Sequence, residues 1–141
     1  MPLDPFVSVR LRPRQRERLE RLARVRGKNA SETLVGLIEE ALRAAEYPLI
    51  HFRDTAVGRE AYVMGTGTAV WEVVWLAEHF EGDAERVAAH MSWPLFKVQA
   101  ALNYAAQFPH EVRDALDDME RGPADLRKIV PGLRVFDARN E

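Results

Sequence analysis

One short segment near the amino terminus constrains the fold more than any other part of the chain. Residues 6–12 alternate between the two faces expected of a half-buried β-strand. One face would carry Val7, Val9 and Leu11, and the other would carry Phe6, Ser8, Arg10 and Arg12. A helical pattern follows directly from Pro13, so the strand has no second strand beside it in this segment. A lone strand leaves its backbone N–H and C=O groups unpaired, and it therefore requires a partner from elsewhere.

Two helices are predicted after the strand. Apolar residues at helical spacing run from Pro13 to Arg26, and Gly27 is expected to end that helix. Asn29 and Glu32 form a capping-box pattern, which starts a second helix that continues to about residue 45.

The predicted unit of one strand and two helices needs a second copy of itself. About 40 residues bury too little apolar surface to be stable alone. Two copies would pair their strands antiparallel about a twofold axis, which satisfies both backbones. The side chains expected to hold this homodimer together are Val7, Val9, Leu11, Leu34 and Ile38.

Positive charge is concentrated at the same end of the chain. Residues 1–28 contain nine basic and three acidic side chains, whereas the remaining residues contain 11 basic and 19 acidic ones. This asymmetry indicates a polyanion-binding head on an acidic body. The alternatives are a solvated arginine-rich helix, and a strand at residues 6–12 that completes a sheet with the rest of the chain.

The outer face of a two-stranded ribbon has the size and chemistry to read DNA. Such a ribbon fits the major groove, where Arg10 can reach guanine O6 and N7 and Ser8 can hydrogen-bond to several base edges. The capped start of the second helix offers the backbone N–H groups of Ala30, Ser31 and Glu32 to a phosphate. We therefore expect double-stranded DNA as a partner of this segment.

Residues 6–46 resemble the ribbon-helix-helix repressors of the CopG, Arc and ParD type. The resemblance is carried by Val7-Ser8-Val9-Arg10-Leu11, the arginine-rich helix, Gly27 and Asn29-x-Ser31-Glu32-x-Leu34. It implies an intertwined homodimer whose ribbon enters the major groove of operator DNA, with higher oligomers on DNA left open. The positions that match base readers are Ser8, Arg10 and a more variable third one, Phe6, which is apolar where readers are usually polar. The residues expected at phosphates are Arg12, Arg14, Arg16, Asn29, Ala30 and Ser31.

A second, mainly helical segment is predicted between residues 47 and 121. Residues 49–53 and 60–64 are interpreted as a small hairpin around a turn at 54–58. The glycine-rich residues 65–68 lack the lysine and spacing of a phosphate-binding loop, so we expect a tight turn in which Thr68 caps the next helix. Helical patterns cover residues 68–80, 83–91, 94–106 and 109–121, and the first of these is expected to be central and buried. The predicted fold class is mainly α, with a ribbon-helix-helix head and a small helical domain that contains a short β-hairpin.

The helices at residues 83–106 have the spacing of a helix-turn-helix. The segment is acidic, and we interpret it as a packing or partner-binding module rather than a DNA reader. The plausible base readers on its second helix are Lys97, Gln99 and Asn103.

Residues 48–120 resemble the small, helix-turn-helix-like VapB-type antitoxin module, which was once classed as a domain of unknown function. The strings that carry this resemblance are Gly58-Arg59-x-Ala61, Gly65-Thr66-Gly67-Thr68-Ala69-Val70-Trp71-Glu72-Val73 and Val98-x-Ala100-Ala101-Leu102-x-Tyr104. The resemblance implies a partner protein, a PIN-like ribonuclease toxin encoded by a neighbouring gene.

The chain offers little chemistry for catalysis or metal binding. It has no cysteine, which excludes disulfides and thiolate metal sites. Its histidines lack metal-binding spacing, although two of them could meet across neighbouring helices: His51, His79, His90 and His110. An acidic run is simpler to interpret as a solvated helix face than as a Mg²⁺ site: Asp114, Asp117, Asp118 and Glu120. We therefore expect no enzyme, no cofactor and no metal.

Residues 122–141 are predicted to be a flexible tail with short apolar islands among charges. Val135 and Phe136 are the residues expected to dock on a toxin, and the alternatives are docking on the body and a frayed terminus. No apolar run is long enough for a membrane helix, and the first residues lack the pattern of a secretory leader. We expect a cytoplasmic, nucleoid-associated protein.

These patterns together predict a homodimeric transcriptional repressor that is also the antitoxin of a toxin–antitoxin pair. The predicted domains are residues 1–46 for DNA binding and dimerisation, residues 47–121 for partner binding, and the tail. One alternative is a ribbon-helix-helix regulator without a toxin, whose second domain senses a small ligand between Trp71, Trp75 and Trp93. Another is an interaction adaptor that does not bind DNA.

Overall fold

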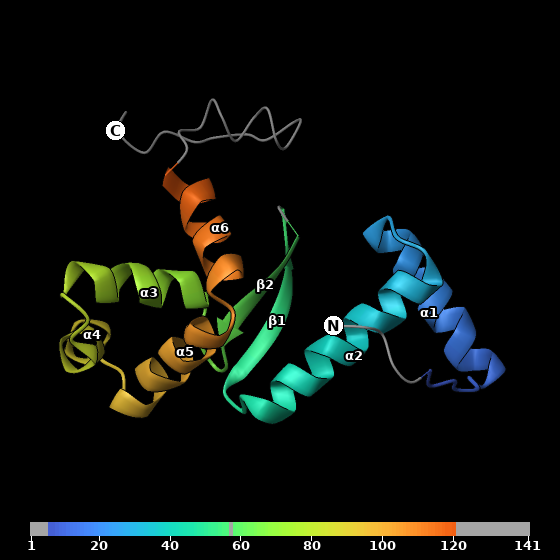
Figure 1. Ribbon diagram of the computed structural model, residues 1–141, viewed down its shortest axis with the longest axis horizontal. Coiled ribbons are helices and arrows are strands. Elements are labelled where there is room, and N and C mark those ends of the chain that lie inside the picture. The colour runs from blue at the N-terminus through green and yellow to red at the C-terminus, as the bar shows by residue number, and fades with distance from the viewer. Residues whose placement is uncertain (1–5, 57, 121–141) are drawn as a thin grey trace. The chain divides into compact units, whose positions relative to one another are not determined.

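The computed structural model describes residues 6–56 and 58–120, which form six helices and one two-stranded sheet (Figure 1). The prediction of a mainly helical chain with a small hairpin is confirmed. The chain divides into two units, Met1–Leu42 and Arg43–Glu141, and the division falls inside the second helix. The predicted tail, with Val135 and Phe136, lies outside the described residues. Within the described ranges, no helix is long and apolar enough to cross a membrane.

Local signals set both ends of the first helix, α1 (Pro13–Arg26). Pro13 takes the first helical position, and the backbone N–H of Arg12 donates to Gln15 Oε1 at 3.0 Å. Gly27 ends the helix with a left-handed φ of 65°, a conformation that glycine adopts at little cost. The predicted bounds of this helix are confirmed.

The second helix, α2 (Ala30–Glu46), starts at the predicted cap. Asn29 Oδ1 accepts the backbone N–H of Glu32 at 2.8 Å, and the hydroxyl of buried Thr33 donates to the Asn29 carbonyl oxygen at 2.8 Å. Among the described residues of this unit, Leu19 and Ala23 are the only buried apolar side chains. The first unit therefore has a very small core of its own.

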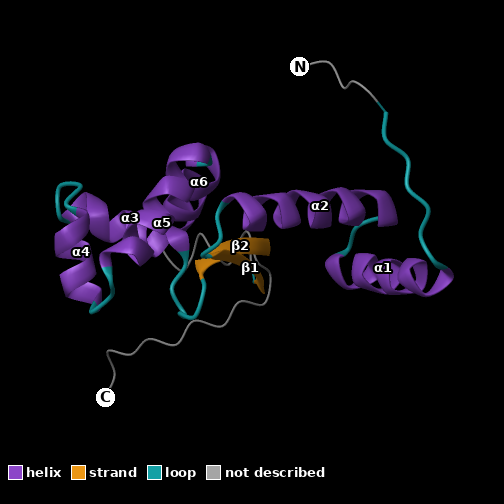
Figure 2. Ribbon diagram, turned by 90° about the horizontal axis from the view of Figure 1, so that it is seen from below, coloured by secondary structure: helices purple, strands orange, loops and turns teal. Residues whose placement is uncertain are grey.

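Residues 6–12 do not form the predicted strand in the single chain. They have no regular secondary structure, and in the described part of the chain both strands belong to the second unit (Figure 2). Val7 and Val9, expected on the buried face, are 83% and 62% exposed. A strand is defined by hydrogen bonds to a neighbouring strand, and no described segment of this chain supplies them.

The hairpin of the second unit joins β1 (Ile50–Thr55) to β2 (Gly58–Val63) in an antiparallel register. It is longer than predicted, because the ladder includes three residues that were assigned to the turn, Asp54, Thr55 and Gly58. Asp54 pairs with Arg59 across the strands, with Oδ1 and Nη1 3.2 Å apart. The hydroxyl of Thr55 donates to the first carbonyl of β2 at 2.7 Å. These contacts hold turn-forming residue types in extended backbone.

Helix α3 (Val70–His79) begins later than predicted, because Thr68 is not its cap. The carbonyl of Thr68 accepts the N–H of Val63 at 3.1 Å, which keeps Thr68 beside the hairpin. The helix is capped at Ala69, whose backbone N–H donates to Glu72 Oε2 at 2.7 Å. The buried residues of α3 are Val70, Val73 and Ala77.

The remaining helices are α4 (Ala84–Met91), α5 (Leu95–Gln107) and α6 (Pro109–Glu120). Asp83 caps α4 as predicted, since its Oδ1 accepts the second and third N–H groups of that turn at 3.1 and 3.2 Å. Pro94 lies at the cap of α5 rather than in its first turn. Helices α4 and α5 have the predicted helix-turn-helix spacing.

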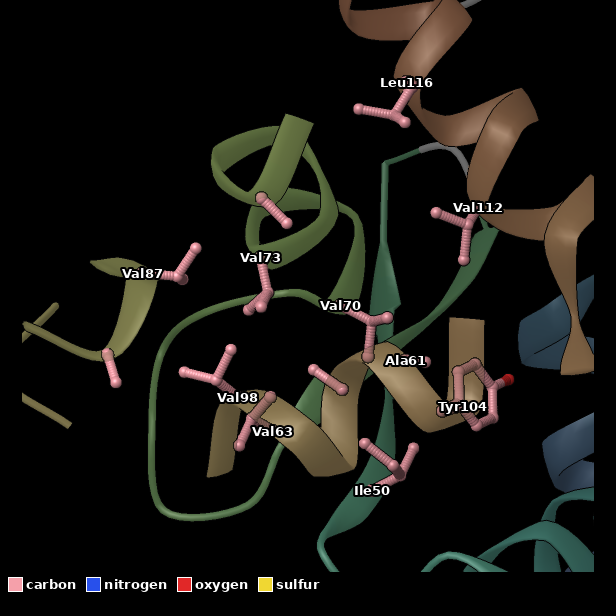
Figure 3. Packing of buried hydrophobic residues seen from close by; sticks show 13 residues of the cluster. Ile50, Ala61, Val63, Val70, Val73, Val87, Val98, Tyr104, Val112 and Leu116 are labelled. Carbon is pink, nitrogen blue, oxygen red and sulfur yellow. The ribbon is translucent and has the colours of Figure 1, made fainter. Parts of the chain in front are cut away.

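The core of the second unit gathers side chains from α3, α4, α5, α6 and the hairpin (Figure 3). Val63, Val73, Val98 and Tyr104 have no exposed surface. Tyr104 is the largest of the fully buried side chains, with its ring 5.4 Å from that of Tyr47. The sequence pattern did not assign Tyr104 to the apolar face of its helix, because a tyrosine hydroxyl needs a specific polar partner when it is buried.

Candidate nucleic-acid interface

The expected base readers lie on residues 6–12, the segment before α1, which we call the arm. Phe6, Ser8 and Arg10 are all exposed. The arm is followed by Pro13, where α1 begins, so these side chains lie directly before the helix that carries six of the nine basic side chains of residues 1–28. Their exposure makes them available to a polyanion.

The expected phosphate contacts Arg12, Arg14 and Arg16 are exposed around the start of α1, whose first turn contains no acidic residue. Arg16 Nε pairs with Glu20 Oε1 at 3.1 Å, and both side chains are exposed. Exposed pairs at this helical spacing contribute only about 0.3–0.5 kcal/mol. Arg16 can therefore exchange Glu20 for a phosphate at small cost.

The start of α2 has two of the three backbone N–H donors that were expected to be offered to a phosphate, because the third, that of Glu32, is already bonded. Because Asn29 Oδ1 accepts the N–H of Glu32, that donor is used inside the helix. The N–H groups of Ala30 and Ser31 belong to the first turn, where backbone donors lack acceptors within the helix. Ser31 is exposed, and its N–H and that of Ala30 are the donors at this end of the helix, with Asn29 as the cap. The phosphate contacts expected at Asn29, Ala30 and Ser31 stay a prediction.

An apolar groove lies between α1 and α2 in the first unit. It has a volume of about 460 Å³ and is lined by Leu11, Gln15, Arg18, Leu19, Leu22, Leu34 and Leu37. Two of the five expected dimer contacts, Leu11 and Leu34, line this groove. Ile38, which follows the groove residue Leu37 in the sequence, is about half exposed. Because this unit has so small a core, an exposed groove lined by leucines is typical of a surface that another protein segment buries.

Three residues of this groove were not assigned to the dimer interface from the sequence: Leu19, Leu22 and Leu37. All three lie in the helical apolar stripes, so the signal was present. The stripe predicts which residues face inward, but it does not distinguish a core shared within one chain from one shared between two.

The second unit contains a partly buried polar cluster, in which Tyr104 is fully buried and the Glu111 side chain is 44% exposed. The Tyr104 hydroxyl donates to Glu111 Oε2 at 2.6 Å, and Arg43 Nη1 donates to the same hydroxyl at 2.8 Å and to Glu111 Oε1 at 3.0 Å. The Arg43 guanidinium also lies 3.8 Å from the centre of the Phe108 ring. Burial and the Glu111 carboxylate raise the pKa of Tyr104, which keeps the hydroxyl protonated and donating.

Two cavities of the second unit share the side chain of Trp71. The smaller, about 200 Å³, has an acidic lining that includes Glu60, Glu111, Asp114 and Asp118. Burial raises the pKa of Glu60 above its usual value, and the nearby Glu72 and Asp118 carboxylates act in the same direction.

The larger cavity, about 440 Å³, is mainly apolar, and we call it the tryptophan groove. Its lining is Thr68, Trp71, Glu72, Trp75, Leu76, Met91, Leu116 and Met119. It brings Trp71 and Trp75 together, as the ligand-sensing alternative expects, but Trp93 is not part of its lining. Trp75, which lies on the helix that was expected to be buried, is 44% exposed, and Met119 is 55% exposed.

The remaining candidate residues are dispersed. His79 packs on Trp75 with ring centres 4.2 Å apart, and His90 packs on Phe80 at 5.5 Å, so these histidines have different partners. In the described ranges, no group of three or more His, Asp or Glu side chains is arranged to hold a metal ion. On α5, Gln99 and Asn103 are exposed and Lys97 is half-buried, with its Nζ 6.0 Å from the Trp93 ring.

No protein-family model matches this chain, and comparisons with curated proteins and with solved structures found no match. The resemblances to ribbon-helix-helix repressors and to VapB-type antitoxins therefore rest on the quoted residues.

Proposed function

We propose that this protein is a homodimeric, DNA-binding transcriptional repressor that acts as the antitoxin of a type II toxin–antitoxin pair. In this function it represses its own operon and neutralises a PIN-like ribonuclease toxin. The observation that carries the proposal is the first unit's combination of an exposed arm of alternating residues, an open leucine groove and a basic helix.

A second copy of the chain accounts for the exposed apolar surface of the first unit. Val9 on the arm is 62% exposed, and Leu11 continues from the arm into the leucine groove. Burying one such side chain fully stabilises by about 1.5–3 kcal/mol, and a twofold axis doubles every contact. Pairing two arms antiparallel also satisfies their backbone groups.

The same pairing makes the arm a DNA reader. When Val7, Val9 and Leu11 face the helices, the alternation of a strand puts Ser8 and Arg10 on the opposite face. The two copies then present these side chains as a ribbon that fits the major groove, with Arg14, Arg16 and the start of α2 near the phosphates.

An electrophoretic shift assay with the full chain tests the DNA-binding part. The DNA upstream of the gene is compared with random DNA of equal length. We expect Arg10→Ala to cost about 1–3 kcal/mol on the upstream DNA and much less on random DNA, because it removes a base contact. Arg14→Ala should weaken both about equally and reduce the salt dependence, because it removes a phosphate contact.

Arg86→Ala is the matched control, since Arg86 is an exposed arginine of the second unit. It should leave the affinity for both DNAs unchanged. If Arg10→Ala weakens both DNAs alike, the base-reading role of Arg10 is wrong. If the wild-type protein shifts neither DNA, the repressor function is wrong and the adaptor alternative replaces it.

The antitoxin part is carried by the second unit and the tail. Residues 43–120 contain six basic and 13 acidic side chains, so this part of the chain repels DNA and suits a protein partner. Co-purification of the full chain with the product of the neighbouring gene tests it. Val135→Asp with Phe136→Asp should weaken capture, whereas Ala138→Asp should not, and equal capture by all variants would remove these two residues from the toxin contact.

One observation favours a second candidate function, a regulator whose second unit senses a small ligand. The tryptophan groove has the volume of a small-molecule site, about 300–1,000 Å³, and is lined by aromatic and aliphatic side chains. Native mass spectrometry of the freshly purified protein tests this, because a retained ligand adds a discrete mass. A ligand of that kind, together with no binding to the neighbouring gene product, would favour the regulator.

A further inference from the structure

The tryptophan groove is an apolar surface without a cover in the described part of the second unit. Its apolar lining comes from Trp71, Trp75 and Leu76 of α3, from Met91 of α4, and from Leu116 and Met119 of α6. The indole of Trp75 and the side chain of Met119 are about half exposed at its edge. Apolar surface gathered in a concave site favours an apolar occupant.

The chain itself continues from the edge of this groove. Met119, a lining residue, is next to the last residue of α6, and 21 residues follow Glu120. Gly122 and Pro123 favour the end of a helix, so the chain can turn there. The apolar residues of the following segment are Leu126, Ile129, Val130, Leu133, Val135 and Phe136.

The length of the segment is sufficient for it to return to the groove. An extended chain spans about 3.3–3.6 Å per residue, so Leu126 is within about 20 Å of the end of α6 and Phe136 within about 55 Å. Because the segment is tethered beside the groove, its effective concentration there is in the millimolar range. A separate protein at cellular concentration would have to compete for the groove with this tethered segment.

Charge favours the same occupant. Residues 121–141 contain five basic and three acidic side chains, whereas residues 43–120 have a large acidic excess. The acidic cavity with Glu60, Asp114 and Asp118 adjoins the groove through Trp71. In the segment, Arg127 and Lys128 lie between Leu126 and Ile129. The segment therefore has basic groups next to apolar ones, just as the acidic cavity lies next to the apolar groove.

From these observations we infer that residues 121–141 bind in the tryptophan groove of their own chain, with Val135 and Phe136 as the main apolar contacts. This inference does not depend on the proposed function. If the same two residues also contact a toxin, the toxin has to release them from the groove, and the groove then regulates the availability of the tail.

Cysteine pairs in the full chain test the inference directly, because the natural chain has no cysteine. Thr68→Cys places a thiol in the groove, and Phe136→Cys places one in the tail. A short bis-maleimide should link this pair within one chain at least ten times faster than it links the control pair Gln99→Cys with Phe136→Cys. Gln99 is exposed on α5 and lines neither cavity.

A second measurement, the quenching of tryptophan fluorescence, needs no substitution in the groove and tests the same inference if Thr68→Cys does not fold. Phe136→Asp should increase acrylamide quenching of tryptophan fluorescence by uncovering Trp71 and Trp75, whereas Ala138→Asp should not. Linked dimers instead of linked monomers would mean that a second copy fills the groove. Equal linking rates for the two pairs, or unchanged quenching in Phe136→Asp, would also overturn the inference, as would a small molecule released from the groove on denaturation.

Discussion

Replacing Tyr104 with phenylalanine removes a single oxygen from the interior of the second unit. The hydroxyl group that is lost donates to Glu111 Oε2 at 2.6 Å and accepts from Arg43 Nη1 at 2.8 Å, and Tyr104 has no exposed surface. Hydrogen bonds to charged groups contribute about 1.5–3 kcal/mol. In Tyr104→Phe, however, Arg43 and Glu111 keep each other at 3.0 Å, so neither charge is left without a partner. We therefore expect a loss of about 1–2 kcal/mol in the free energy of unfolding.

Urea unfolding followed by tryptophan fluorescence measures this loss. The three tryptophans of the chain, Trp71, Trp75 and Trp93, all belong to the second unit, so the signal reports on that unit. The slope of the free energy against urea should not change, because the same surface becomes exposed on unfolding.

Tyr62→Phe is the matched control, since the same atom is removed from the same unit. The Tyr62 hydroxyl lies 3.5 Å from Glu60 Oε2, a distance at which a hydrogen bond is weak, and the side chain is only partly buried. Its loss should cost less than about 0.5 kcal/mol. If Tyr104→Phe costs no more than Tyr62→Phe, the polar cluster does not stabilise the unit and the reasoning is refuted.

Two further predictions concern the second unit. The pKa of Glu60 is raised in the folded state, so stability falls as pH rises from the usual carboxyl pKa through the raised one. Glu60→Gln should therefore be more stable than the wild type at pH 7 and close to it at pH 4, by urea unfolding at each pH. Asp83→Ala should cost about 0.5–2 kcal/mol in the same assay, because it removes the cap of α4, whereas Asp117→Ala on the exposed face of α6 should change stability by less than about 0.5 kcal/mol.

The helix ends were predictable because they depend on residues close in sequence. Gly27 and Asn29 act through their own backbone or side chain within one turn, and Asp83 does the same for α4. The predicted bounds of the hairpin and of the start of α3 were wrong because they depend on contacts between different segments rather than on residues within one turn. Thr68 is held by Val63, and the ladder at Asp54 is held by a cross-strand arginine, contacts that depend on pairing.

Buried polar groups were less predictable than buried apolar ones. Val98 and Leu116 follow from helical periodicity, and both are buried. The position of Tyr104 depends on Arg43 and Glu111, which are separated from it in sequence by 61 and seven residues. A pattern of period 3.6 contains no information on such partners.

The candidate interface shows the limit of a single chain most clearly. The basic helix was predicted from the sequence and is confirmed, and the residues expected to read bases are exposed, whereas pairing of the arm with a second strand stays a prediction. The arm remains irregular because its hydrogen-bond partners are absent from the described chain. Leu19, Leu22 and Leu37 belong to an apolar stripe that the sequence predicts, but only the groove indicates that this stripe is incompletely covered.

Sedimentation equilibrium of the full chain at micromolar concentration tests the central claim, that the first unit pairs through its arm. We predict a species of twice the 16.1 kDa chain mass. Val9→Pro should convert it to a monomer that no longer shifts DNA, because proline removes a backbone donor at the centre of the ribbon. Val135→Pro, the same replacement in the tail, should leave the dimer intact. A wild-type monomer with helical content unchanged, or a dimer that survives Val9→Pro, would contradict the account.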